Sequence, residues 1–141
     1  MNNLHYLLAL NRMDKIGPRT VFKLLTRWPN LQHLFQLSAM ELEQAGLPKA
    51  IAHTITAFDL NQVQADLEWS EASEENHLLS WENPDYPEIL KEISDPPIIL
   101  YAQGDLSALK QTKLAVVGSR NPSITGSENA KHFAKEIASQ G

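Results

Sequence analysis

The sequence has 141 residues, of which 43% are hydrophobic and 21% are charged, so it can bury a core and is not a disordered chain. Cysteine is absent, which excludes disulfides and thiolate metal sites. The five histidines are scattered at no ligand spacing, so we expect no metal and no cofactor. The apolar stretch Leu4 to Leu10 is too short to span a bilayer and is a poor secretion signal, which predicts a cytoplasmic protein without membrane contact.

The net charge of -5 is unevenly distributed along the chain. Residues 61–95 hold ten acidic residues against Lys91 alone, whereas both flanking segments carry more bases than acids. Since the distribution of charge decides electrostatic steering, the acidic average does not exclude nucleic acid as a partner. We expect the acidic run from Asp66 to Asp95 to form a solvated linker surface.

Residues 1–68 predict a domain of short helices. Pro18 is well placed as the first residue of a helix, with basic side chains on the face opposite its apolar residues. The apolar residues expected to face inward in the first two helices are Leu4, Leu7, Leu8, Val21, Leu24, Leu25 and Trp28. Asn30 is a candidate cap for a third helix.

Two further helices complete the predicted helical domain. Ser38 and Glu41 have the spacing of a capping box, which opens a helix that ends near Gly46. A final helix is predicted from Pro48 as far as Leu67.

The turn at Gly17 resembles half of a helix-hairpin-helix, in which backbone amides and nearby bases contact a DNA phosphate. Gly17, Arg19 and Lys23 are the candidate contacts, and residues 45–48 resemble a second, weaker hairpin. Two alternatives stay open: a glycine that merely joins packed helices with a solvated basic face, and a surface for a protein partner.

The polar, acidic stretch 69–76 predicts a linker, and residues 77–141 predict a second domain. Strands are expected at 77–81 and 98–101, with a helical turn between them and a chain reversal at Gly104. The apolar run Lys113–Val117 is typical of a strand covered on both faces in a parallel sheet. A helix is predicted from about Ser127, with Ala130, Phe133, Ala134, Ile137 and Ala138 facing that sheet.

The residues after Val117 have the chemistry of an anion site. Gly118 lets the backbone approach a phosphate, Ser119 offers a hydroxyl, and Arg120 can bind phosphate oxygens with two hydrogen bonds. Asn121 and Gly126 add further donors and a second glycine turn before a helix N-terminus. The alternative is a simple strand-to-helix turn with a solvated arginine. Ser119 has no neighbouring base, so we expect no nucleophile and no catalytic residue here.

Three separated motifs resemble those of the DNA-processing protein A (DprA/Smf) family. They read Tyr86-Pro87-x-x-Leu90, then Asp95-Pro96-Pro97-x-x-Leu100-Tyr101-x-x-Gly104, then Val116-Val117-Gly118-Ser119-Arg120. The resemblance covers residues 81–141. One departure is Thr125, where the family commonly has an aromatic residue before the glycine that corresponds to Gly126.

This resemblance implies a fold of class α + α/β. It consists of a helical domain of sterile-alpha-motif (SAM) or helix-hairpin-helix type (1–68), an acidic linker (69–76), and the first part of an extended Rossmann fold (77–141). It also implies a non-enzymatic protein that binds single-stranded DNA through Gly118, Ser119 and Arg120, is a homodimer at full length, and loads RecA during natural transformation.

Because the family continues beyond the last residue of this chain, we expect an N-terminal fragment. Such a fragment should bind DNA weakly at best and should self-associate through open sheet edges. Two other functions remain as alternatives. One is a Rossmann-type nucleoside monophosphate phosphoribohydrolase of the lysine-decarboxylase-like group, and the other is a protein-docking module formed by residues 1–68.

Overall fold

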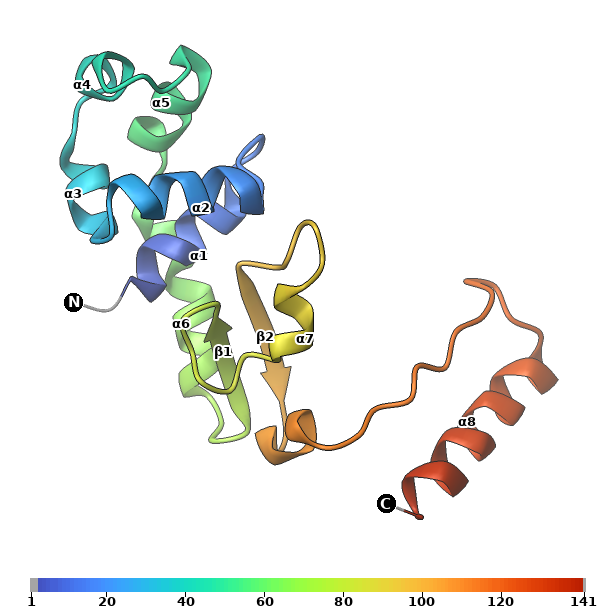
Figure 1. The fold of residues 1–141 in the computed structure, drawn as a ribbon. Helices are drawn as coiled ribbons and strands as arrows, with labels where there is room; N and C mark the ends of the chain where they lie inside the picture. The colour runs from blue at the N-terminus through green and yellow to red at the C-terminus, as the bar shows by residue number, and fades with distance from the viewer. Residues whose placement is uncertain (1–2, 141) are drawn as a thin grey trace. The chain divides into compact units, whose positions relative to one another are not determined.

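The computed structural model describes residues 3–140 and divides the chain into two compact units. The front unit ends at Lys110, and the rear unit begins at Gln111. Helices dominate, and one small antiparallel sheet is present among the described residues (Figure 1). The domain limits at 1–68, 69–76 and 77–141 stay predictions. No helix within residues 3–140 is long and apolar enough to cross a membrane.

The front unit opens with the predicted series of short helices. They are α1 (Leu4–Arg12), α2 (Pro18–Arg27), α3 (Leu31–Gln36), α4 (Ala39–Gln44), α5 (Lys49–Ala57), the 3-10 helix η1 (Leu60–Val63) and α6 (Gln64–Glu71). Two predicted caps are confirmed. The Asn30 side chain accepts a hydrogen bond from the Gln32 amide at 3.0 Å, and Ser38 and Glu41 form a reciprocal capping box. Local sequence therefore fixes where these helices begin.

The prediction of one helix from Pro48 to Leu67 is wrong, because α5 ends at Ala57. Phe58 is extended, and the carboxylate of Asp59 accepts a hydrogen bond from the Asn61 amide at 3.0 Å. An aspartate that bonds a nearby backbone amide favours a new helix start over continuation of the old helix. The chain then forms η1 and turns into α6.

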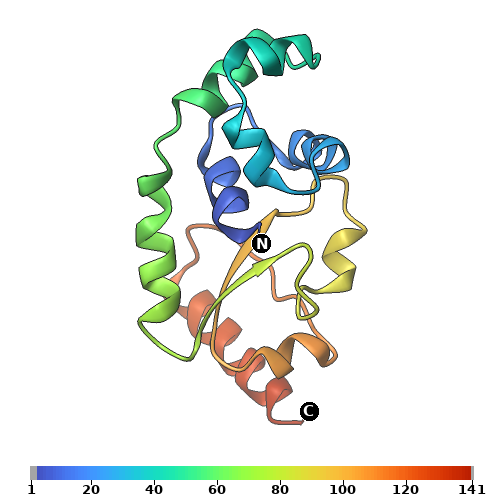
Figure 2. The ribbon, with the colours of Figure 1, turned by 90° about the vertical axis from the view of Figure 1, so that its left-hand side faces the viewer.

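Two strands complete the framework of the front unit. Strand β1 (Asn76–Ser80) pairs antiparallel with β2 (Ile99–Gln103), with Leu79 opposite Leu100. The short helix α7 (Glu88–Lys91) lies between them in sequence, and the 3-10 helix η2 (Leu106–Lys110) follows. Gly104 turns the chain as predicted, with a φ of 106° that favours glycine. Both views of the fold show α6 beside this pair of strands (Figures 1 and 2).

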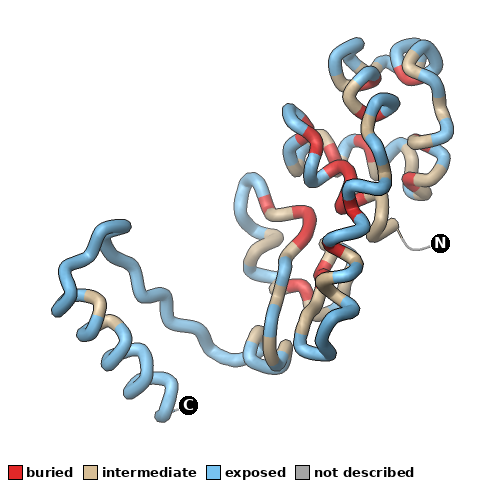
Figure 3. Tube along the Cα trace, turned by 180° about the vertical axis from the view of Figure 1, so that it is seen from behind, coloured by how far each residue is buried: buried red, intermediate tan, exposed pale blue. Residues whose placement is uncertain are grey.

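The core of the front unit joins the helices to the sheet (Figure 3). Its apolar members share exposures of 9% or less: Leu7, Leu8, Ala9, Leu10, Met13, Ile16, Val21, Leu24, Leu31, Leu34, Leu42, Ala52, Ile55, Val63, Leu78, Ile98 and Ile99. The predicted inward faces of α1 and α2 are confirmed, since Leu7, Leu8, Val21 and Leu24 are buried. Helices and sheet therefore share one hydrophobic cluster.

A partly buried ion pair links helices α1 and α6 of the front unit. The Arg12 guanidinium donates two hydrogen bonds to the Asp66 carboxylate, at 2.7 and 2.8 Å. Tyr101 of β2 also lowers the pKa of this carboxylate. The expectation of a solvated acidic run from Asp66 is thus wrong at its first residue, which is only 6% exposed. A buried carboxylate needs such partners, because an isolated buried charge is costly.

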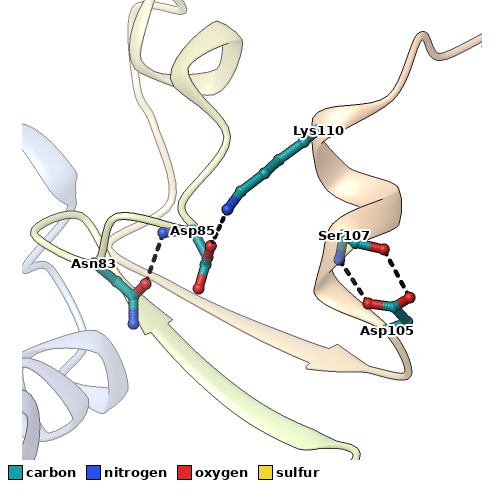
Figure 4. Close-up of polar contacts among 5 residues, drawn as sticks. All are labelled: Asn83, Asp85, Asp105, Ser107 and Lys110. Carbon is teal, nitrogen blue, oxygen red and sulfur yellow. Dashed lines mark hydrogen bonds and ion pairs between the residues drawn. The ribbon is translucent and has the colours of Figure 1, made fainter.

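A hydrogen bond connects the two proline segments of the front unit, Tyr86-Pro87 and Asp95-Pro96-Pro97. Tyr86 is almost fully buried, and its hydroxyl donates to the Pro97 carbonyl at 2.8 Å. Next to it, Lys110 at the end of η2 forms an ion pair with Asp85 at 2.7 Å (Figure 4). The Asn83 side chain accepts a hydrogen bond from the Asp85 amide at 2.8 Å, which orders the same loop. These contacts fix the last residues of the front unit against the loop before α7.

The rear unit contains one helix and departs from the predicted strand. Helix α8 (Ile124–Ala138) begins three residues before the predicted start at Ser127, because Ser123 caps it. The run Lys113–Val117 forms no strand, and Val117 is 90% exposed. A strand requires a neighbour that accepts its backbone hydrogen bonds, and no described segment pairs with this run. The helix face expected to meet a sheet is exposed too, including Phe133.

We predict that Arg12 and Asp66 are energetically coupled. Replacing either residue with alanine should lower the free energy of unfolding by roughly 1–3 kcal/mol, less than for a fully buried pair because Arg12 is partly exposed to solvent. The double variant should cost clearly less than the sum of the single variants. Urea denaturation of all four proteins measures this coupling. Strictly additive losses would show that the pair contributes nothing of its own.

The same network predicts how stability depends on pH. The hydrogen bond from Arg12 lowers the pKa of Asp66, so its contribution is present above the ordinary aspartate pKa of about 3.9 and is lost as the pH falls through the lowered value. Burial raises the pKa of Tyr101 to about 12, so stability should also fall between about pH 10 and 12. Thermal unfolding across pH should show both losses, and Asp66→Asn should remove the acidic one.

Tyr86→Phe tests the hydrogen bond from the Tyr86 hydroxyl to the Pro97 carbonyl. Loss of the hydroxyl leaves the Pro97 carbonyl without its donor and should cost about 1 kcal/mol of unfolding free energy. Tyr6→Phe is the matched control, because Tyr6 is half-buried and its hydroxyl has no hydrogen-bond partner within residues 3–140. Chemical denaturation should separate the two variants, and equal stabilities would argue against a structural role for the hydroxyl.

Candidate phosphate-binding turn

The rear unit forms a shallow hollow between the extended run before Gly118 and the start of α8. The hollow has a volume of about 460 Å³. Its lining residues are Val116, Val117, Gly118, Ser119, Pro122, Ser123, Gly126, Ser127 and Ala130. The structure therefore brings together three of the predicted site residues, Gly118, Ser119 and Gly126. Arg120 and Asn121 are exposed and do not line the hollow.

Hydroxyl groups hold the two turns that bound this hollow. The Ser119 hydroxyl accepts a hydrogen bond from the Asn121 amide at 3.2 Å. The Ser123 hydroxyl accepts one from the Gly126 amide at 3.1 Å, which caps α8. Since a helix leaves its first amides without internal acceptors, the amides of Ile124 and Thr125 remain available to an anion.

The two glycines of the site have different structural roles. A Cβ at Gly118 would meet nothing within 4 Å, so the backbone there is open to the approach of a ligand. A Cβ at Gly126 would lie 3.1 Å from the Ser123 hydroxyl oxygen. Gly126 therefore leaves room for the helix cap, and this role differs from the donor role that the sequence suggested.

Arg120 carries the positive charge of the turn. It is exposed and forms no ion pair with any residue between 3 and 140. A guanidinium without an internal carboxylate partner retains its full set of donors for a phosphate. The turn thus combines one exposed cation with backbone amides and hydroxyls, and no acidic side chain among the described residues lines the hollow.

Sequence reasoning missed two serines that line the hollow. Ser123 stands in the polar loop before the predicted helix and is not among the predicted site residues, and Ser127 is predicted only as the start of that helix. The signal for Ser123 was present, since serine is a preferred residue immediately before the first helical turn. Ser127 had no such signal, because its place in the hollow depends on how the helix follows the turn.

The three residues predicted as helix-hairpin-helix contacts, Gly17, Arg19 and Lys23, have different surroundings. Gly17 directly precedes α2, as expected, but Arg19 forms an ion pair with Asp95 at 3.0 Å. The Arg27 guanidinium bonds the Ala45 carbonyl and lies 4.8 Å from the ring centre of Trp28. Helix α2 carries three bases, Arg19, Lys23 and Arg27. Of these, only Lys23 has no polar partner among the residues that the structure describes. A role for Gly17, Arg19 and Lys23 in DNA binding stays a prediction.

Comparison with known proteins gives consistent results. Residues 77–141 match the family described as DNA recombination-mediator protein A. The chain is 46% identical over 57 residues to DNA processing protein DprA of Bacillus subtilis, which covers 40% of this chain and 19% of that protein. It is 32% identical over 105 residues to protein Smf of Escherichia coli, which covers 74% of this chain and 28% of the relative.

A third relative and the search of structures complete the comparison. Protein Smf of Borreliella burgdorferi is 41% identical over 56 residues, covering 40% of this chain and 18% of that protein. No solved structure is significantly similar to the chain. The chain spans less than a third of the length of each of these relatives.

The cap of α8 can be tested by mutation. Ser123→Ala removes the acceptor for the Gly126 amide and should fray the first helical turn, at a cost of about 1 kcal/mol. Backbone Cα chemical shifts and amide hydrogen exchange of residues 124–127 report this directly. Ser127 lines the same hollow but does not cap the helix. The first turn of α8 should therefore stay intact in the Ser127→Ala variant. Equal fraying in both variants would contradict the assigned cap.

Proposed function

We propose that this chain, which belongs to the DNA recombination-mediator protein A (DprA/Smf) family, binds single-stranded DNA at the turn that follows Val117. The observation that carries this proposal is the unpaired Arg120 beside the hollow formed by Gly118, Ser119 and the start of α8. This turn lies within the 77–141 segment that matches the family.

The chemistry of the turn suits the sugar-phosphate backbone. Arg120 can donate two hydrogen bonds to one phosphate, while the first amides of α8 bind a phosphate oxygen with the positive end of the helix dipole. None of these groups reads a base edge, so binding should depend little on sequence and strongly on salt. The open backbone at Gly118 lets the strand come close.

The family also supports a wider functional assignment, which we include in the proposal. Residues 77–141 would form the beginning of an extended Rossmann fold, in which the apolar run 113–117 becomes a parallel strand between neighbouring strands. The 1–68 region would be a helical module of SAM or helix-hairpin-helix type. The complete protein would be a cytoplasmic, non-enzymatic homodimer that protects incoming single-stranded DNA and loads RecA during natural transformation.

The rival function is enzymatic. A nucleoside monophosphate phosphoribohydrolase also uses a Gly-Ser turn and an anion-binding helix, and its paired acids are expected in a segment downstream of this turn. Release of free base from a nucleoside monophosphate would favour the enzyme over DNA binding.

Arg120→Ala tests the proposed site. Binding of fluorescent oligo-dT should weaken by several-fold at low salt, because one phosphate contact is lost. The dependence of log affinity on log salt should become shallower by about 0.7, the contribution of one released counterion on a single strand. Fluorescence anisotropy at several salt concentrations measures both quantities.

Two variants serve as controls for this experiment. Lys135→Ala removes an equal charge from the last turn of α8 and should leave binding nearly unchanged. Arg120→Lys keeps the charge but loses the paired hydrogen bonds, so it should retain part of the affinity. If Arg120→Ala and Lys135→Ala bind equally well, the turn is not the contact site.

A further inference from the structure

A second hollow lies in the front unit, between α2 and the α4–α5 hairpin. Its volume is about 340 Å³. The residues that line it are Thr20, Lys23, Leu24, Arg27, Trp28, Gly46, Leu47, Pro48 and Ile51. Leu24 is buried at its base, while Trp28, Leu47 and Ile51 are half-buried and present apolar surface to solvent. A concave apolar floor of this size fits one or two side chains of a partner.

The wall of this hollow is held in place by Arg27. Its guanidinium donates to the Ala45 carbonyl at the end of α4 and lies over the Trp28 ring, 4.8 Å from the centroid. Gly46 follows with a φ of 90°, which favours glycine, and a Cβ there would lie 3.9 Å from the Arg27 Nη1 atom. These contacts join α2 to the end of α4 at the edge of the hollow.

The charge of the hollow has one sign. Lys23 and Arg27 are its only charged lining residues, and no carboxylate lines it. Arg19, one turn before Lys23, has its carboxylate partner in Asp95, whereas Lys23 has none among the described residues. A complementary ligand must therefore supply acidic groups around an apolar centre.

We propose that this hollow binds a short acidic peptide segment of another protein, with an aliphatic or aromatic side chain seated on Leu24, Leu47 and Ile51. The aromatic residue of the lining, Trp28, already has the Arg27 guanidinium over its ring, and Leu24, Leu47 and Ile51 are aliphatic. This lining favours a peptide anchor over a nucleobase, which stacks best on a free aromatic face.

A second copy of this chain offers residues 88–95, an acidic segment with exposed Ile89 and Ile93. Two of its acids are already in ion pairs, Glu88 with Lys91 and Asp95 with Arg19, so we favour a segment of another protein.

Selection from a library of random short peptides on the whole chain tests this proposal. The expected binders carry several acidic residues around one or two large apolar residues. Synthetic versions should bind in a salt-sensitive way and shift the amide resonances of Lys23, Leu47 and Ile51. Lys23→Glu should weaken them by about tenfold or more, because it reverses the rim charge.

Two variants separate the hollow from general charge effects. Lys131→Glu makes the same charge change on exposed α8, in the rear unit, and should leave peptide affinity unchanged. Leu47→Ser removes apolar floor while keeping the charge, and it should weaken the same peptides. Circular dichroism confirms that each variant is folded, so that a loss of binding is attributable to the surface.

Three results would overturn the proposal. The first is that no peptide is selected, or that the selected peptides show no acidic bias. The second is that the selected peptides bind wild type and Lys23→Glu equally. The third is that oligo-dT shifts the resonances of Lys23 and Leu47 while the peptides do not, which would identify a nucleic-acid surface. Loss of DNA binding in Arg120→Ala is a separate readout, so the two proposals can fail independently.

Discussion

The carboxylate of Asp66 joins the parts of the front unit that are most distant in sequence. It accepts two hydrogen bonds from Arg12, which is 54 residues away, and Tyr101 of β2 also lowers its pKa. Around it, the rings of Trp69 and Tyr101 lie 5.5 Å apart. Because an unpaired carboxylate at this depth would be costly, the three elements that carry these groups must come together as one. The helical region and the sheet must therefore fold together.

The three motifs of the DprA/Smf family divide into a structural and a chemical group. The Tyr-Pro and Asp-Pro-Pro segments are joined by the hydrogen bond from Tyr86 to the Pro97 carbonyl, which lies inside the front unit. In the third motif, Gly118 and Ser119 line an exposed hollow, and Arg120 is exposed and forms no ion pair within residues 3–140. The first two motifs form part of the scaffold, and the third is the one that we propose to contact a ligand.

Local features of the fold could be predicted from the sequence, whereas distant ones could not. The Ser38–Glu41 capping box, the Asn30 cap and the turn at Gly104 depend on residues within a few positions of one another. Nothing near Asp66 distinguished it from the other acids of its segment, because its partner lies on α1.

The candidate site shows the same limit. The turn chemistry at 118–120 was predictable from residue types, but the strand expected before it needs a paired neighbour to exist. The position of Gly126 against Ser123 was not predictable either, because it depends on the packing of a helix cap.

The bond between Tyr86 and Pro97 has an evolutionary consequence. Its acceptor is a main-chain oxygen, which every amino acid supplies, while its donor is a phenol that only tyrosine places at that distance. Selection on this contact therefore acts directly on the identity of residue 86. At position 97 it acts only on residues that would change the course of the backbone. Substitutions at the two positions need not compensate one another, so covariation between them would be a poor guide to this contact.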